Sequence, residues 1–392
     1  MSEAAHSALS PSALAATVAL GAVGAVFVLK YGSEVSPLAG VGTMVFAVGY
    51  VGVVVAATIL SPRLSENAAR RVGIGLGGAL LAASVALALL VPEANDVARL
   101  PALDVWLERL FDGTYPYGLP IRPSGFPGLY LLALPFWATG LLVLLPVVGL
   151  GVFLAALRRT HPASWLPILA GLALLPSFHF EVVVHSELFL NSALVLLSLG
   201  VFEWVRQRGN TALFFAAALA GLILSTRLYV GAVYAVYGAF AFRSDWTRGA
   251  MVAATALTVW AATWGPFLAW DPERFAAFGP FAVQGLYLPR WLIVASVGAA
   301  LALGWHASDL RAVVARSGWL LLALVVVSGV LTVDRSAPLA AFAGFDVAYL
   351  VLPTPFLLLA LGGRRLRDEA THQPEREYAP PLAPDPSTSD LA

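Results

Sequence analysis

The sequence contains no cysteine and carries little charge. None of the 392 residues is Cys, which excludes disulfides, thiolate nucleophiles, iron–sulfur clusters and cysteine-ligated zinc. Asp, Glu, Lys and Arg together make up 12% of the chain, about half of the share found in a typical soluble domain. Lys30 is the single lysine among 23 basic residues, and the formal net charge is zero. The balanced charge argues against a nucleic acid as the partner.

Apolar side chains take the place of the missing charge. Hydrophobic residues account for 59% of the chain, and the mean hydropathy is +0.82. A soluble globule cannot bury that proportion of apolar side chains, so a water-soluble enzyme is excluded and a multi-span membrane protein is expected. Alternating segments of about 10 residues do not dominate, which argues against a β-barrel. We therefore expect an all-α polytopic protein in a lipid bilayer.

The apolar runs predict about 10 to 12 transmembrane helices. We divided the runs at charge clusters, Pro and Gly. The fourth run is long and contains Pro135 and Pro146, so it predicts either one kinked helix or a short helix followed by a full span. The candidate spans are residues 13–30, 38–60, 72–92, 127–157, 164–178, 188–205, 211–225, 228–242, 249–270, 290–306, 318–333 and 347–363.

The distribution of arginine predicts that both ends of the chain lie in the cytoplasm. With the N-terminus inside and the spans alternating, 15 basic residues fall in the inner loops and tail, and eight fall outside. Every inner loop is short and contains at least two Arg, in agreement with the positive-inside rule. We expect the protein in the plasma or inner membrane. The first apolar run follows no Lys or Arg, so we predict a retained span and not a cleaved signal peptide.

Three regions follow from this topology. Residues 1–92 form an N-terminal region of three spans, and residues 93–363 form the main transmembrane module with long outer loops at 93–126 and 271–289. Residues 364–392 are rich in Pro, Asp, Glu and Ser, and we expect a disordered cytoplasmic tail. Because loops on a rigid scaffold carry function, chemistry is expected on the outer face.

The first outer loop contains a predicted amphipathic helix at residues 101–112. Leu103, Leu107 and Leu110 share one face, which would lie in the membrane interface. Asp104, Glu108 and Asp112 recur every four residues and share the opposite face. This acidic face is either solvated surface or a place where one carboxylate enters a cavity and acts as a base.

The same loop resembles a known family of membrane enzymes. It reads Asp104-Val-Trp, then Gly113-Thr-Tyr115-Pro-Tyr117, then Pro123-Ser-Gly-Phe-Pro at the start of a span. This order is similar to the GT-C superfamily of membrane glycosyltransferases, and most similar to the polyprenyl-phosphate-mannose-dependent mannosyltransferases. Further short matches occur at His185-Ser-Glu187, Ser225-Thr-Arg227, Asp271-Pro-Glu-Arg274 and Asp346-x-x-Tyr349. Together they extend over about residues 100–363.

The resemblance implies an inverting transfer of a sugar, such as mannose, from a polyprenyl-phosphate donor to an extracytoplasmic glycan, lipid or protein. Asp104 is the position that matches the general base of the family. A base takes the proton of the acceptor hydroxyl, and cations stabilise the leaving phosphate. Arg227 and Arg274 are the leading phosphate ligands, with Arg122 and Arg290 behind them. The polar side chains expected to bind substrate are Tyr115, Tyr117, His185 and Glu187.

Several alternatives remain open from the sequence. The Asp104 loop follows the third span, whereas the family usually places it after the first, so Glu34 and Asp112 are fallback positions for the base. The spacing His179-x-Glu181-x-x-x-His185-x-Glu187 could hold a divalent metal, but it matches no known ligand spacing, and no cofactor is expected. No nucleotide-binding glycine motif occurs in a plausible sequence context, so a nucleotide-sugar donor is not indicated. The alternative functions are a secondary transporter and a non-catalytic membrane protein.

Overall fold

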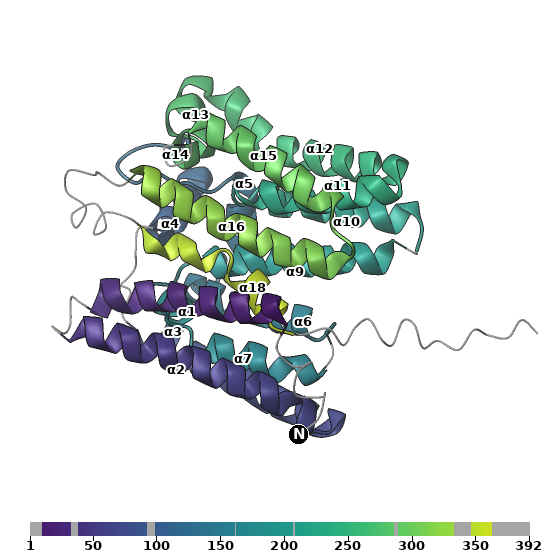
Figure 1. Ribbon diagram of the computed structural model, residues 1–392. Coiled ribbons are helices and arrows are strands. Elements are labelled where there is room, and N and C mark those ends of the chain that lie inside the picture. Colours follow the sequence, from purple (N-terminus) through teal and green to yellow (C-terminus); the bar gives the residue numbers. More distant parts are fainter. Residues whose placement is uncertain are drawn as a thin grey trace, which may run out of the picture.

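The computed structural model describes residues 10–32, 38–91, 99–160, 162–206, 208–285, 289–332 and 346–362. These residues form helices and contain no strand (Figure 1). The prediction of an all-α chain is therefore confirmed for the described part. The fallback base Glu34 and the tail predicted at 364–392 lie outside the described residues.

The helices are α1 (Pro11–Gly32), α2 (Ala39–Leu60), α3 (Glu66–Leu90), α4 (Arg99–Phe111), α5 (Pro127–Ala138), α6 (Leu145–Leu157), α7 (Trp165–Ala173), α8 (Pro176–Val183), α9 (Leu188–Val205), α10 (Asn210–Leu224), α11 (Val230–Ser244), α12 (Trp246–Trp270), α13 (Pro272–Phe278), α14 (Pro280–Gly285), α15 (Arg290–Trp305), α16 (Leu310–Thr332) and α18 (Thr354–Ala360).

Six of these helices are long and apolar enough to cross a membrane. They are α1, α2, α3, α9, α12 and α16, and the number rises to eight if two bent helix pairs each count as one span. The multi-span prediction is therefore confirmed, whereas the predicted number of 10 to 12 spans is not reached by long helices. Four predicted spans correspond instead to five apolar helices of 10–17 residues. A 15-residue helix is about 22 Å long, which is shorter than the hydrocarbon core of a bilayer.

Proline and glycine explain where the shorter helices begin and end. The predicted span 127–157 divides into α5 and α6, because Gly140 adopts a positive φ of 70° and Pro146 lies in the first turn of α6. Neither predicted form of this segment is present. The segment is not one continuous kinked helix, and neither of its two helices is long enough for a full span. The predicted span 164–178 bends by 62° between α7 and α8, where Pro176 begins the second helix.

The helices lie side by side with their long axes in roughly one direction (Figure 1). Helices α1, α2, α3 and α7 form one side of the bundle, and α10, α11, α12 and α15 form the other. Helix α9 lies between them and packs along α6. Its side chains are largely buried, as expected for a helix that is apolar on all sides and central in a bundle.

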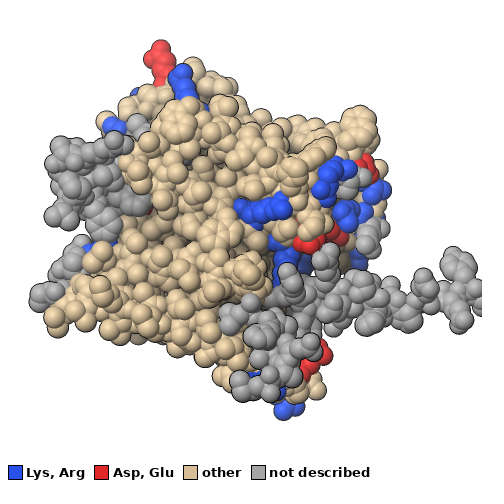
Figure 2. All heavy atoms as spheres, viewed as in Figure 1, with Lys and Arg blue, Asp and Glu red and all other residues tan. Residues whose placement is uncertain are grey.

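The predicted inner loops meet at one end of the bundle, which we call the arginine end. It comprises residues 61–71, 158–160, 162–165, 206, 208–211, 243–248 and 305–316. Arg243 donates hydrogen bonds to the carbonyl oxygens of Trp305 and Ala307 at 2.6 and 2.8 Å, and Arg248 reaches Arg206 O at 3.3 Å. On the face shown in Figure 2, blue side chains gather toward this end, and most of the surface beside them is uncharged. The opposite end, which we call the loop end, comprises residues 99–126, 184–187, 225–229 and 271–285.

The absence of cysteine allows the orientation of these two ends to be measured. Glu273 on α13 is exposed at the loop end, and Asn67 on α3 is exposed at the arginine end. If the arginine end faces the cytoplasm, Glu273→Cys is expected to react with a membrane-impermeant maleimide in intact cells. Asn67→Cys is expected to react only after permeabilisation. The reverse pattern would show that the chain inserts in the opposite orientation.

Candidate active site at the loop end

A buried ion pair connects two residues that the sequence singled out for separate roles. The Arg227 guanidinium contacts the Glu187 carboxylate through Nη2 and Oε1, and the two side chains are 4% and 0% exposed. Arg227 lies in the turn between α10 and α11, whereas Glu187 immediately precedes α9. Through Nη1, Arg227 also donates a hydrogen bond to Ser124 Oγ in the loop before α5. One side chain therefore joins three separate segments of the chain.

Both members of this pair are held in their charged forms. Burial by itself raises the pKa of Glu187, but Arg227 and Arg99 outweigh it and hold that pKa below its usual value. Burial likewise lowers the pKa of Arg227, but Glu187 raises it above the ordinary value. Arg227 is thus a cation compensated by a buried carboxylate, and its contact with the lipid phosphate stays a prediction.

A second ion pair lies beside the first and is centred on Arg99 at the start of α4. Arg99 Nη2 lies 2.5 Å from Asp346 Oδ2, and Nη1 donates a hydrogen bond to Ser186 Oγ at 3.2 Å. The guanidinium also stacks over the Tyr349 ring at 5.1 Å. Burial lowers the pKa of Arg99, but Asp346 and its neighbours raise it well above the usual value. The last of the short sequence matches, Asp346-x-x-Tyr349, therefore contacts Arg99 near the start of the first predicted outer loop.

The His and Glu residues at 179–187 turn toward different partners. Glu181 Oε2 accepts hydrogen bonds from the amides of Leu188 and Phe189 at 3.1 and 3.3 Å, so the carboxylate caps α9. His179 Nε2 is 2.7 Å from Ala173 O, and His185 Nε2 is 3.0 Å from Ala88 O. Among the described residues, no group of three or more His, Asp or Glu side chains is placed to hold a metal.

Asp104 lies on α4, where the structure confirms the predicted amphipathic helix. Leu103, Trp106 and Leu107 are buried, whereas Asp104 is half-buried and Glu108 is exposed. Asp104 Oδ1 accepts a hydrogen bond of 2.9 Å from the indole Nε1 of Trp137 on α5. The apolar face therefore packs against α5, and the indole fixes the orientation of the carboxylate. Asp112, a fallback position for the base, is exposed beyond the end of α4.

An aromatic stack connects α4 to the loop that holds Arg227. The rings of Trp106 and Tyr130 are parallel, with centroids 4.0 Å apart. The Tyr130 hydroxyl accepts a hydrogen bond of 3.2 Å from the amide of Gly125, the residue after Ser124. At the start of α5, a Cβ atom on Gly128 would lie 2.5 Å from Leu222 O and 2.6 Å from Ser225 O, so only glycine allows this close approach. The α4–α5 unit is thus fixed against the Arg227 turn.

Tyr115 and Tyr117, predicted to bind substrate, are buried and contact the protein itself. The Tyr115 hydroxyl donates to Phe267 O at 3.1 Å, and the Tyr117 hydroxyl donates to Gly125 O at 3.1 Å. Burial and the nearby Asp271 carboxylate raise the pKa of Tyr115 to about 12, so its hydroxyl remains protonated at neutral pH. These two hydroxyls hold the loop in place in the described structure.

Arg274 is the other predicted phosphate ligand, and it lies at the surface of α13. Its side chain is 60% exposed, and its Nε atom is 3.3 Å from Asp271 Oδ2. Asp271 also caps α13 by accepting a hydrogen bond of 2.9 Å from the Arg274 amide. An exposed pair one helical turn apart is weak, so this guanidinium can exchange its partner at little cost. Arg122 and Arg290 are also exposed at this end.

Two amide side chains at this end, the half-buried Gln284 and the fully buried Asn191, were not assigned a role by sequence reasoning. Gln284 Nε2 donates to Ser124 O at 2.5 Å, and its Oε1 atom accepts from the Leu228 amide at 2.8 Å. Asn191 lies one turn into α9, fully buried, and its amide atoms have no hydrogen-bond partner among the described residues. Glu187 Oε2 and Arg227 Nε also have none within that part of the chain. A lone amide in an apolar segment gives no sequence signal that distinguishes these two residues from others.

The structure therefore brings together Arg227 and Glu187, and His185 precedes Glu187 by two positions in the sequence. Asp104, Tyr115 and Tyr117 lie in the adjoining α4–α5 unit, and Arg274 lies at the surface of α13. Comparison of the chain with protein-family models, curated proteins and solved structures finds no match in any of the three.

Proposed function

We propose that the protein is an integral membrane glycosyltransferase of the GT-C type. It would transfer a sugar, such as mannose, from a polyprenyl-phosphate donor to an extracytoplasmic glycan, lipid or protein acceptor. The observation that carries the proposal is the meeting, at one end of the bundle, of segments that the sequence singled out separately. The Ser124 loop, Glu187 and Arg227 are in direct contact, and the stacked rings of Trp106 and Tyr130 connect them to the helix of Asp104.

In the proposed reaction, Asp104 is the general base. Its carboxylate takes the proton of the acceptor hydroxyl while the acceptor oxygen forms a bond to the anomeric carbon of the sugar. The bond from that carbon to the phosphate oxygen breaks, and polyprenyl phosphate leaves with the electron pair. Attack opposite the leaving group inverts the anomeric centre. The hydrogen bond from Trp137 to Asp104 Oδ1 supports this role, because it leaves Oδ2 for the acceptor.

The cations of the site have different proposed tasks. Arg227 is neutralised by the buried Glu187 and Arg99 by the exposed Asp346, so both arginines position the loops and contribute little net charge toward a phosphate. Arg274 and Arg122 are exposed at the same end and are better placed to bind the lipid phosphate. Glu187, Asn191 and Arg227 also have hydrogen-bonding atoms without partners among the described residues, and these atoms are buried.

The proposal can be tested with purified protein in liposomes that contain polyprenyl-phosphate-linked mannose. With a hydroxyl acceptor, such as an alkyl mannoside, we expect one polyprenyl phosphate to be released for each sugar transferred. The new linkage is expected to have the anomeric configuration opposite to that of the donor. If mannose is not transferred, a panel of other polyprenyl-phosphate sugars shows whether the enzyme uses a different donor sugar or catalyses no glycosyl transfer. If no donor in the panel is consumed, the glycosyltransferase proposal fails in favour of the transporter or the non-catalytic alternative.

A further inference from the structure

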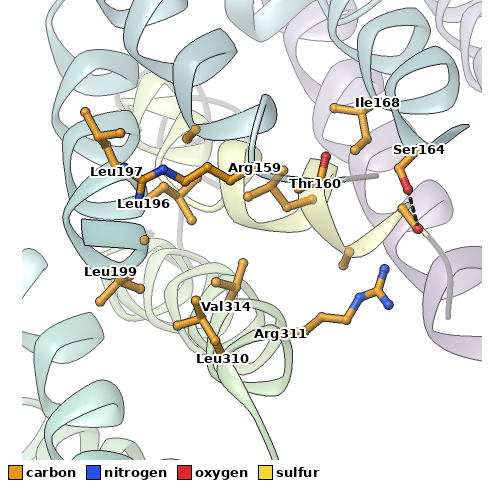
Figure 3. A pocket seen from close by; sticks show the side chains of 15 residues that line it. Arg159, Thr160, Ser164, Ile168, Leu196, Leu197, Leu199, Leu310, Arg311 and Val314 are labelled. Atoms are coloured by element: carbon orange, nitrogen blue, oxygen red, sulfur yellow. Dashed lines mark hydrogen bonds between the residues drawn. The ribbon is translucent and has the colours of Figure 1, made fainter. Parts of the chain in front are cut away.

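A cavity lies at the arginine end of the bundle, whereas the candidate active site lies at the loop end. Its volume is about 190 Å³, and it lies between α7, α9, α16 and α18. The side chains that Figure 3 shows around it include Leu196, Leu199, Leu310 and Val314, so most of the wall is aliphatic. The aliphatic part of the wall is therefore suited to a hydrocarbon group.

Two arginines border this apolar cavity. Arg159 follows α6, and its guanidinium lies against α9, where a Cβ on Gly200 would be 3.1 Å from Nη1. Arg311 lies in the first turn of α16. In Figure 3 the two guanidinium groups point toward different sides of the opening. Asp309 caps α16 by accepting a hydrogen bond of 2.8 Å from the Ala312 amide, and its charge also acts on Arg311. Among the described residues, neither Arg159 nor Arg311 forms an ion pair with a carboxylate.

The combination of an aliphatic cavity wall and two cations at its opening favours an amphiphile with an anionic head. We propose that the cavity binds one acyl chain of an anionic phospholipid and that Arg159 and Arg311, on different sides of the opening, attract its anionic head group. Basic clusters next to membrane spans attract anionic lipids by about 1 kcal/mol per residue. This proposal does not depend on the proposed enzymatic activity.

The inference is tested by the thermal unfolding of purified protein in a neutral detergent. Phosphatidylglycerol and phosphatidylcholine with the same acyl chains are added separately, and inorganic phosphate and glycerol phosphate serve as probes of the head alone. Phosphatidylglycerol is expected to raise the melting temperature in a saturable manner, and the other three compounds are expected to have little effect. Arg311→Gln and Arg159→Gln should each weaken the apparent affinity for phosphatidylglycerol by about fivefold.

Two further variants keep the result specific to this cavity. Arg63→Gln removes an exposed arginine near the same end that does not line the cavity, so it should leave the affinity unchanged. Ala360→Phe fills the cavity and should remove the saturable effect even though both arginines remain. Equal effects of the two lipids, an equal loss in Arg63→Gln, or full binding in Ala360→Phe would each overturn the proposal. Stabilisation by inorganic phosphate equal to that by phosphatidylglycerol would replace the lipid with a free anion, and would overturn it as well.

Discussion

Replacing Arg227 by Met is expected to destabilise the folded protein by about 3–5 kcal/mol, because it leaves a buried carboxylate without its counter-charge. Glu187 is fully buried, and Arg227 is the only arginine among the described residues in ion-pair contact with it. Methionine has a similar length, so the loss of charge outweighs the loss of packing. The effect is measured as the change in melting temperature and in the yield of monodisperse protein in detergent.

A double variant separates the charge from the packing. Glu187→Gln alone is expected to destabilise the protein, since it leaves the Arg227 guanidinium buried and unbalanced. Glu187→Gln combined with Arg227→Met removes both charges and should recover a large part of the loss. As a matched control, Arg274→Met breaks an exposed pair and should change stability by less than about 1 kcal/mol. Strictly additive losses in the double variant would contradict a direct ion pair.

The pair also makes stability depend on pH. Because the pKa of Glu187 is lower in the folded protein than in the unfolded chain, the unfolded chain binds the proton first as the pH falls. The contribution of the pair is therefore complete above the ordinary pKa of a glutamate, and it is lost as the pH falls through the lowered value. We expect the acid-induced decrease in melting temperature to be smaller in the double variant than in the wild type.

The Asp104→Asn variant is expected to lower the rate of sugar transfer by about 10²–10⁴-fold, which is the usual contribution of a general base. Asparagine retains an oxygen that can accept the hydrogen bond from Trp137, so the fold of α4 and α5 should be kept. The change removes only the ability to take a proton. Initial rates are measured in the liposome assay, and circular dichroism and the melting temperature verify the fold.

Two neighbouring carboxylates provide matched controls for Asp104. Glu108→Gln removes an exposed charge one turn farther along the same helix, and it should leave the rate within about twofold of the wild type, because surface substitutions away from a site have small effects. Asp112→Asn tests the exposed fallback position in the same way. Full activity in Asp104→Asn together with a large loss in Asp112→Asn or Glu34→Gln would move the base to that residue.

The positions of the helices were predictable because apolar runs are local in the sequence. Helix α9 occupies residues 188–205 as predicted, and α2 begins one residue after the start of the predicted span 38–60. The breaks at Gly140 and Pro176 were only partly predictable. Proline marks where a helix can end, but the 62° bend between α7 and α8 depends on what the two helices pack against.

The candidate site was predictable as a set of residues but not as a set of contacts. Arg227 and Glu187 were selected for different tasks, and nothing in the segment between them indicates that they bind each other. Trp137, which orients Asp104, lies in an apolar run that predicts a membrane span and no polar contact. Arg99 was assigned only to the outer loops, since its partner Asp346 is 247 residues away. Such pairings depend on tertiary packing, which local patterns do not encode.

Photocrosslinking with a polyprenyl phosphate that carries a photoreactive group near its phosphate tests the central claim most directly. The account predicts saturable crosslinks to peptides from the loop end, at residues 99–126 and 271–285, that are competed by the unmodified lipid phosphate. The cavity at the arginine end provides the internal comparison, because it lies at the other end of the same bundle. Crosslinks confined to residues 158–165 and 305–316 would contradict the placement of the donor site beside the Arg227–Glu187 pair.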